Sequence, residues 1–149
     1  MSLQEQVMEK IKEAMKAKDS EALEPLRAIK AEILLARTRT NSNEELSEEE
    51  EIKMLQKLVK QRKESASLYQ EKDREDLAKP ELFQASIIAS FLPKQLDEQA
   101  VKTIIKTIIE ANNASSIKDM GKVMGLASKE LAGKSDGKMI SNIVKELLT

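Results

Sequence analysis

The chain has 149 residues, a net charge of −1, 40% hydrophobic and 34% charged residues, and only four Gly and three Pro. This composition is too hydrophobic for a disordered chain and too poor in turn residues for an all-β fold, so we predict an all-α protein. The absence of His and Cys excludes Ser-His-Asp and Cys-His catalytic sites, disulfides, and metal sites built from imidazole or thiolate ligands. One Tyr and two Phe are too few for a base-stacking platform.

The sequence also carries no pattern typical of export or membrane insertion. The first twenty residues mix Glu with Lys and contain no apolar run, and no apolar stretch of membrane-spanning length follows. We therefore expect a cytoplasmic protein without a signal peptide or a membrane partner. The nearly balanced charge provides no bulk field toward nucleic acid, so we expect no DNA binding, and any RNA binding must come from a local patch.

The first 92 residues show a helical period in four segments. Ser2 and Glu5 form a capping-box pattern before a helix over residues 3–18. Its predicted apolar stripe is Leu3, Val7, Met8, Ile11 and Met15. A second helix ends at Thr38, and Pro25 either opens it or kinks it. Its predicted apolar positions are Leu26, Ile29, Ile33 and Leu34.

A polar loop over residues 39–47 separates these helices from a long third one. The loop and the following turn contain six Glu, but they lack the Gly and the alternating oxygens of a Ca²⁺ loop, so we predict a solvated segment. Ser47 and Glu50 form a second capping-box pattern that opens the third helix. A polar bend over Asp73–Lys79 follows, and Pro80 occupies the first turn of the fourth helix. That helix carries Leu82, Phe83, Ile87, Ile88 and Phe91.

Leu92-Pro93 ends this series and divides the chain into domains 1–92 and 93–149. Asp97 caps the first of three further helices. The next helix starts at Ser116, runs along Ile117 and ends at Gly133, and Asp136 opens the last one. The predicted architecture is a bundle of four helices followed by a three-helix unit.

Two patterns that resemble catalytic motifs have simpler explanations. The Ser-x-x-Lys formed by Ser115 and Lys118 lacks the companion motifs of penicillin-interacting enzymes and is better explained as a helix cap. Gly133-Lys134-Ser135 resembles the end of a P-loop, but Ser128 stands where that motif needs Gly. We therefore assign no catalytic residue, no metal site and no cofactor.

Gly121 and Gly125 stand four residues apart within a helical pattern, where each costs up to about 1 kcal/mol relative to Ala. They form a smooth strip that either packs tightly against a neighbouring helix or admits a phosphate backbone or a partner. The candidate RNA-binding residues beside this strip are Lys118, Lys122, Lys129, Lys134 and Lys138. Residues 94–149 hold nine Lys against seven acidic residues, a slight excess of +2.

The segment Asp119-Met-Gly-Lys-Val-Met-Gly125 resembles the signature of the GatB/YqeY family. Further matching segments extend the resemblance over essentially the whole chain: Leu26-Arg27-x-Ile29-Lys30, Lys60-Gln-Arg-Lys-Glu-Ser65 with Tyr69, Arg74-x-Asp76-Leu77, Leu92-Pro93-x-Gln95-Leu96 and Gly133-Lys134-x-Asp136-Gly137. The residues carried over as the family motif are Arg62, Asp119, Met120, Gly121, Gly125, Gly133, Asp136 and Gly137.

The resemblance implies a YqeY-like protein similar to the C-terminal helical and tail region of the B subunit of glutamyl/aspartyl-tRNA amidotransferase. It implies an accessory role, binding tRNA or an amidotransferase-type partner, and a link to carbon–nitrogen ligase activity with glutamine as the amide donor. We expect no catalysis by the chain alone. The alternatives are a component of an amide-nitrogen transfer enzyme and a helical protein-interaction domain that binds no nucleic acid.

Overall fold

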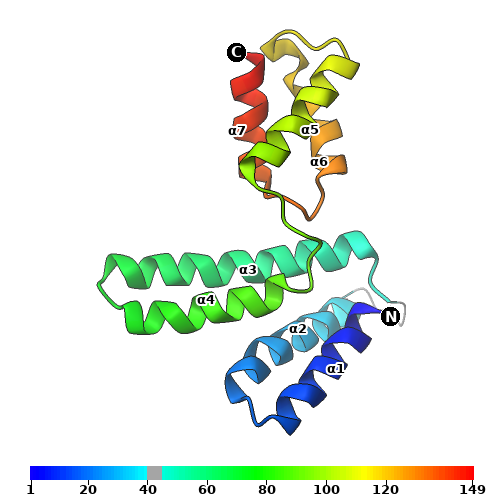
Figure 1. The fold of residues 1–149 in the computed structure, drawn as a ribbon. Helices are drawn as coiled ribbons and strands as arrows, with labels where there is room; N and C mark the ends of the chain where they lie inside the picture. The colour runs from blue at the N-terminus through cyan, green and yellow to red at the C-terminus, as the bar shows by residue number, and fades with distance from the viewer. Residues whose placement is uncertain (40–44) are drawn as a thin grey trace. The chain divides into compact units, whose positions relative to one another are not determined.

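The computed structural model describes residues 1–39 and 45–149, and these residues form helices joined by turns, with no β-strand among them (Figure 1). The elements in chain order are α1 (Leu3–Lys16), α2 (Ser20–Arg39), α3 (Glu48–Glu71), α4 (Glu75–Ala89), α5 (Glu98–Ala111), the short 3₁₀ helix η1 (Ile117–Asp119), α6 (Met120–Glu130) and α7 (Gly137–Leu148). The prediction of an all-α fold is confirmed. Most of the predicted loop 39–47, including Glu44 of the acidic run, lies outside the described residues.

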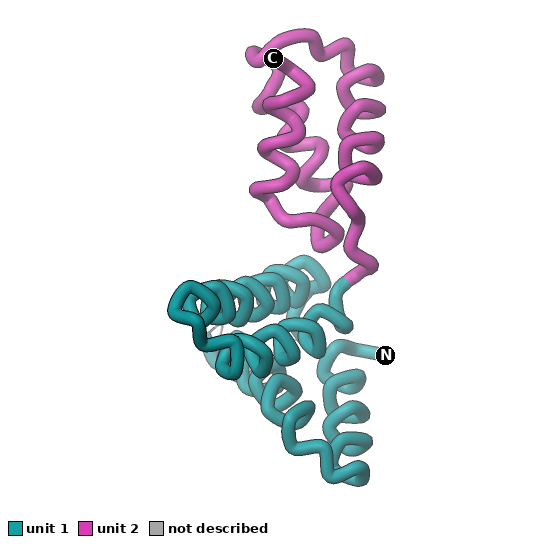
Figure 2. Tube along the Cα trace, turned by 60° about the vertical axis from the view of Figure 1, so that its left-hand side comes forward, with its two compact units in different colours: residues 1–92 teal, residues 93–149 magenta. Residues whose placement is uncertain are grey.

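The chain divides into two compact units, Met1–Leu92 (unit 1) and Pro93–Thr149 (unit 2), which Figure 2 shows in different colours. Each unit has its own cluster of buried apolar side chains. A separate core is what a segment needs to fold by itself. Independent folding of the two domains stays a prediction.

Unit 1 consists of two helical pairs. α1 packs against α2, while α3 and α4 lie antiparallel, and α2 contacts α4 (Figure 1). All four helices contribute to the core, through side chains such as Val7, Ile29, Leu55 and Ile88, each at most 2% exposed. The apolar periodicity of the four helices is explained by this single core.

Side-chain caps define most helix starts, as the sequence predicts. Ser2 Oγ accepts a hydrogen bond from the N–H of residue 5 at 3.2 Å, although only this half of the expected capping box forms. Ser47 and Glu50 form the complete box. The carboxylates of Asp97 and Asp136 accept N–H bonds at 2.8 and 2.7 Å at the starts of α5 and α7.

Both prolines of the bundle lie in the second helical turn. α2 starts five residues before Pro25, so this proline is inside the helix and does not open it. α4 starts at Glu75, so the predicted bend over Asp73–Lys79 and the first-turn position of Pro80 are wrong. Residues 75–79 are compatible with a helix, and a proline this close to the start removes only one backbone hydrogen bond. The bend is limited to the turn around Asp73, whose φ is 58°.

Several residues predicted to line buried stripes are exposed instead. They are Met15, Leu34, Leu82, Phe83 and Ile117, with exposed fractions between 38% and 57%. In α1 the buried face follows Leu3, Val7, Ile11 and Ala14, and Met15 points about 100° away from Ala14. Periodicity predicted the presence of each helix but not the edges of its buried face.

Unit 2 packs α5, α6 and α7 around a core of aliphatic side chains. Val101, Ile105, Val123, Leu131 and Val144 are completely buried. The predicted single helix from Ser116 to Gly133 is wrong at both ends. Its first turn is the 3₁₀ helix η1, and α6 ends at residue 130, before a turn in which the φ of Gly133 is 76°.

Candidate nucleic-acid interface

α6 has one buried face and one open face. Val123 and Ala127 are completely buried in the core of unit 2. The opposite side of α6 carries exposed residues, among them Gly121, Lys122, Gly125, Leu126 and Lys129. Lys122 and Lys129 stand seven residues apart and therefore project from the same side of the helix, about 10 Å apart along its axis. That these two lysines form part of one binding site stays a prediction.

The two glycines of α6 face open space. Apart from its chain neighbours and the backbone of its own helix, a Cβ atom built on Gly121 or Gly125 would meet no atom within 4 Å. The first interpretation of the strip, tight packing against a neighbouring helix of the last three, is therefore wrong, because no other helix of unit 2 approaches it. Neither glycine has a positive φ that would require its flexibility. The second interpretation of the strip, a surface open to a partner, is the one consistent with this geometry.

The candidate RNA-binding lysines are all exposed and carry free charges. They are Lys118, Lys122, Lys129, Lys134 and Lys138. None of them forms an ion pair with a residue in the described ranges 1–39 and 45–149. The ion pair found in unit 2 joins Lys102 on α5 to Glu146 on α7, at 3.4 Å. The five ammonium groups are thus not neutralised by described carboxylates.

Lys118 lies in η1, where the backbone is held by a capping box. Ser116 Oγ accepts the N–H of Lys118 at 3.4 Å, and the Asp119 carboxylate accepts the N–H groups of Ser115 and Ser116 at 3.0 and 3.4 Å. The cap is therefore Ser116, with Asp119 as its partner. No hydrogen bond joins the Ser115 hydroxyl to the Lys118 ammonium, so this Ser-x-x-Lys pattern does not form a nucleophile–base pair in the structure.

Lys134 and Lys138 flank the start of α7. Asp136 caps this helix, Gly137 is its first residue, and a Cβ at Gly137 would meet open space. The start of the helix thus combines free N–H groups with two exposed lysines, an arrangement that favours anions. Within unit 2 the fold places lysines on α6 and at the start of α7, two helices that pack together.

The remaining motif residues have structural roles. Met120 is half-buried and packs against the core of unit 2. Arg62 belongs to unit 1, where its Nε donates to Gln84 Oε1 at 3.4 Å and links α3 to α4. The structure thus assigns Arg62 to a helix–helix contact within unit 1.

Gln95 is a residue whose role sequence reasoning missed. Its side-chain amide donates hydrogen bonds to the carbonyl oxygens of Pro93 and Gly133. The signal available in the sequence was the Leu92-Pro93-x-Gln95-Leu96 segment, which indicated a boundary but not a contact 38 residues further along the chain.

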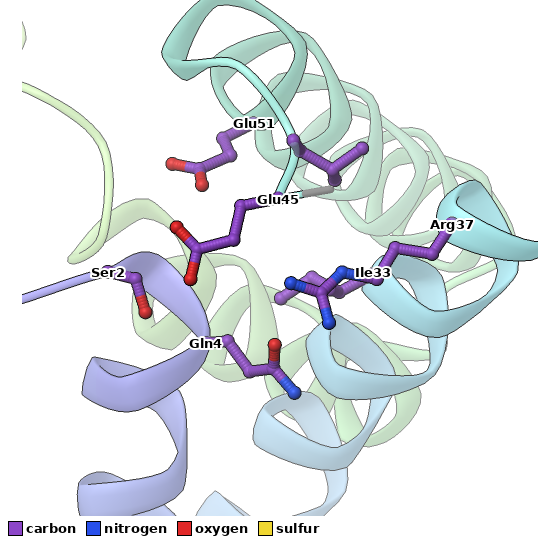
Figure 3. Close-up of a pocket in the computed structure, with 7 residues that line it drawn as sticks. Ser2, Gln4, Ile33, Arg37, Glu45 and Glu51 are labelled. Carbon is purple, nitrogen blue, oxygen red and sulfur yellow. The ribbon is translucent and has the colours of Figure 1, made fainter. Parts of the chain in front are cut away.

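A small polar cavity of about 10 Å³ lies at one end of unit 1, lined by side chains from α1, α2, α3 and the segment before α3 (Figure 3). Figure 3 shows Arg37 and Gln4 pointing into it, with Glu45 and Glu51 at its rim. Burial, followed by the neighbouring charges of Glu45 and Glu48, raises the pKa of Glu51 above its usual value. The cavity has room for about one water and not for a larger ligand.

Neither a metal-binding cluster nor a membrane-spanning helix occurs in the part of the chain that the structure describes. Among these residues, no group of three or more acidic side chains lies close enough to hold a metal ion. No helix among them combines the length and the apolar character that crossing a bilayer requires. The predicted cytoplasmic location is not tested by these findings and stays a prediction.

Two helical units, the second with an open face of glycines and lysines on α6, define a small all-α protein. Comparison with protein families identifies this class further: the model of the family described as Yqey-like protein matches residues 4–148. The chain belongs to the YqeY-like family, as the motif resemblance predicted. No curated protein matches the chain at a significant level of similarity.

Proposed function

We propose that the chain is an accessory protein that binds the phosphate backbone of tRNA through unit 2. The observation that carries this proposal is the set of five exposed, unpaired lysines on η1, α6 and the start of α7. Phosphate contacts by Lys supply most of the sequence-independent affinity for nucleic acids. The net excess of +2 in residues 94–149 is small, so clustering of the lysines provides the attraction.

Two features of the surrounding surface favour an anionic ligand. The carboxylates of Asp119, next to Lys118, and of Asp136, two residues from Lys134 and Lys138, accept backbone N–H groups as helix caps, whereas the exposed Glu130 beside Lys129 does not. Their charge is partly compensated by these bonds. The bare helix surface at Gly121 and Gly125 lets a backbone approach α6 more closely than side chains would allow.

The proposal is one of binding and not of catalysis by the chain alone. Without His or Cys, an amidase mechanism would need a Ser-Lys pair. Ser115 and Lys118 form no such hydrogen bond, and in the second Ser-x-x-Lys, Ser135 to Lys138, the serine hydroxyl donates to Met139 Sδ instead. Carbon–nitrogen ligase chemistry with glutamine as the amide donor would then belong to a partner enzyme. Ammonia release from glutamine should be absent for the purified chain, and a release that survives purification and disappears in Ser115→Ala would refute this part.

The binding test compares charge-reversal variants against unfractionated tRNA. We expect Lys122→Glu with Lys134→Glu to weaken binding at least about tenfold at low salt, equally for different tRNA species, because phosphate contacts carry no sequence information. The control is Lys106→Glu with Lys145→Glu, at exposed positions of α5 and α7. It changes the net charge of the chain by the same amount as the test pair. About three phosphate contacts should give a log–log salt slope of roughly −2 to −3. Equal weakening by both pairs, or no binding at low salt, would contradict the proposal.

A protein partner of the amidotransferase type is a second candidate, favoured by two exposed apolar residues in η1 and α6. Ile117 is 52% exposed and Leu126 is 39% exposed. A helical interaction domain without nucleic acid would use these side chains, and its binding would depend weakly on salt. Leu126→Ser should then abolish capture of an amidotransferase subunit and leave tRNA affinity unchanged, whereas the lysine variants should do the reverse.

A further inference from the structure

The connection between the two units is tied to the loop that carries Lys134. Unit 2 begins at Pro93, directly after the last residue of unit 1, and α5 begins five residues later. Between these points Gln95 and Leu96 both bond to the α6–α7 loop, far away in the sequence. We propose that Gln95 is a latch that holds this connection on the Gly133–Lys134 loop and thereby fixes the position of Lys134.

The latch consists of three hydrogen bonds. One Nε2 group of Gln95 donates to Pro93 O at 2.9 Å and also to Gly133 O. Next to it, the backbone N–H of Leu96 donates to Lys134 O at 2.9 Å. Because an amide NH₂ has two hydrogens, Gln95 can make both of its bonds at once. The Gln95 side chain and the Leu96 backbone together join the start of unit 2 to two consecutive residues of the loop, Gly133 and Lys134.

The loop is held by the core at its two ends and by the latch between them. Leu131 is completely buried before the loop, and the buried Ser135 donates to Met139 Sδ after it. Gly133, at φ 76°, turns the chain outward and leaves its carbonyl for Gln95. The Lys134 carbonyl accepts from Leu96, while its N–H donates to Leu131 O at 2.9 Å, so opening the latch removes one of these two backbone bonds and loosens the backbone that carries the Lys134 ammonium.

This arrangement couples the connection between the units to the surface of unit 2. A ligand that holds the Lys134 loop in its latched position also restrains Pro93–Leu96. Because coupling is reciprocal, closing the latch raises the affinity for the ligand by the same factor by which the ligand favours the closed latch. The coupling to tRNA rests on the proposed function. The latch itself does not, because it can be measured without any ligand.

The first experiment uses amide hydrogen exchange on the full chain. Gln95→Met keeps the length and charge of the side chain and removes both donors, and Gln99→Met is the matched control at an exposed position of α5. We expect exchange at Leu96 to accelerate roughly fivefold to tenfold in Gln95→Met and to remain unchanged in Gln99→Met. Exchange at Val123 should stay as slow as in the parent chain. Unchanged exchange at Leu96, or equal acceleration at Val123, would overturn a local latch.

The second experiment separates the latch from the proposed function. With unfractionated tRNA as the probe, Gln95→Met should weaken binding about twofold to fivefold in the parent chain and in Lys122→Ala, but have no effect in Lys134→Ala. Equal effects in both lysine backgrounds would show that Gln95 does not act through Lys134. If the parent chain binds no tRNA, the proposed function fails while the exchange result still decides whether the latch exists.

Discussion

The glycine strip of α6 gives a prediction in which stability and binding change in opposite directions. The perturbation is Gly121→Ala together with Gly125→Ala. Both positions are exposed and lie inside α6, and an added Cβ would meet no atom within 4 Å outside its chain neighbours and the backbone of its own helix. The substitutions therefore change helix propensity and surface shape without changing the core.

The expected stabilisation follows from helix propensity. Gly is less favourable than Ala by about 0.8–1.0 kcal/mol per residue in a helix interior, because the Gly backbone loses more entropy on folding. Two open positions should therefore stabilise unit 2 by about 1.6–2 kcal/mol, a factor of roughly 15 to 30 in its unfolding equilibrium. Gly133→Ala is the matched control with the opposite sign, since a φ of 76° strains any residue with a Cβ.

Amide exchange at the buried residues Val123 and Ile143 measures this change in the full chain. The double alanine variant should slow exchange at both residues, and Gly133→Ala should accelerate it. Destabilisation by the double substitution would show that another part of the molecule packs on the strip in solution. That result would refute the inference that this face of α6 is open.

The same double variant tests why a helix would keep two exposed glycines. Two methyl groups on the strip hold a phosphate backbone away from the helix, so tRNA affinity should fall while stability rises. The control Ser128→Ala, also exposed on α6, adds no methyl group to the strip and should leave affinity unchanged. Unchanged tRNA affinity in the double glycine variant would show that the glycine strip is not part of the surface through which the lysines bind tRNA.

Three further predictions concern stability. Burial and nearby carboxylates raise the pKa of Glu51, so ionisation of this side chain opposes folding and stability is lost as the pH rises through this pKa. Glu51→Gln should therefore stabilise unit 1 at pH 7 by less than about 1 kcal/mol. In a pH series of thermal unfolding this gain should disappear below the usual Glu pKa. Lys18 has a φ of 55° after α1, so Lys18→Gly should raise the melting temperature of unit 1, with a gain of about 1 kcal/mol in unfolding experiments. Leu131 is completely buried, so Leu131→Ala should lower the free energy of unfolding of unit 2 by about 2–5 kcal/mol in denaturant and leave that of unit 1 unchanged. An equal decrease in both units would contradict separate cores.

The helical class and the places where most helices start were determined by the sequence alone. Caps such as those of Ser47, Asp97 and Asp136 depend on atoms within three residues of each other, so a short sequence pattern contains the whole interaction. The same locality explains why the start of α4 was misplaced: Pro80 is compatible with either of the first two turns, and the pattern alone does not distinguish them.

Only the tertiary structure decided which face of each helix is buried and what the open faces contain. Met15 and Ile117 fit the apolar period but lie outside the cores. The neighbouring helices bury a narrower face of each helix than the one over which its apolar residues are spread. Gly121 and Gly125 have the spacing of a helix-packing strip, yet the packing of α5 and α7 leaves them uncovered. Gln95 bonds to Gly133 across 38 positions, and such a pairing exists only once the chain has folded, since no local preference encodes it.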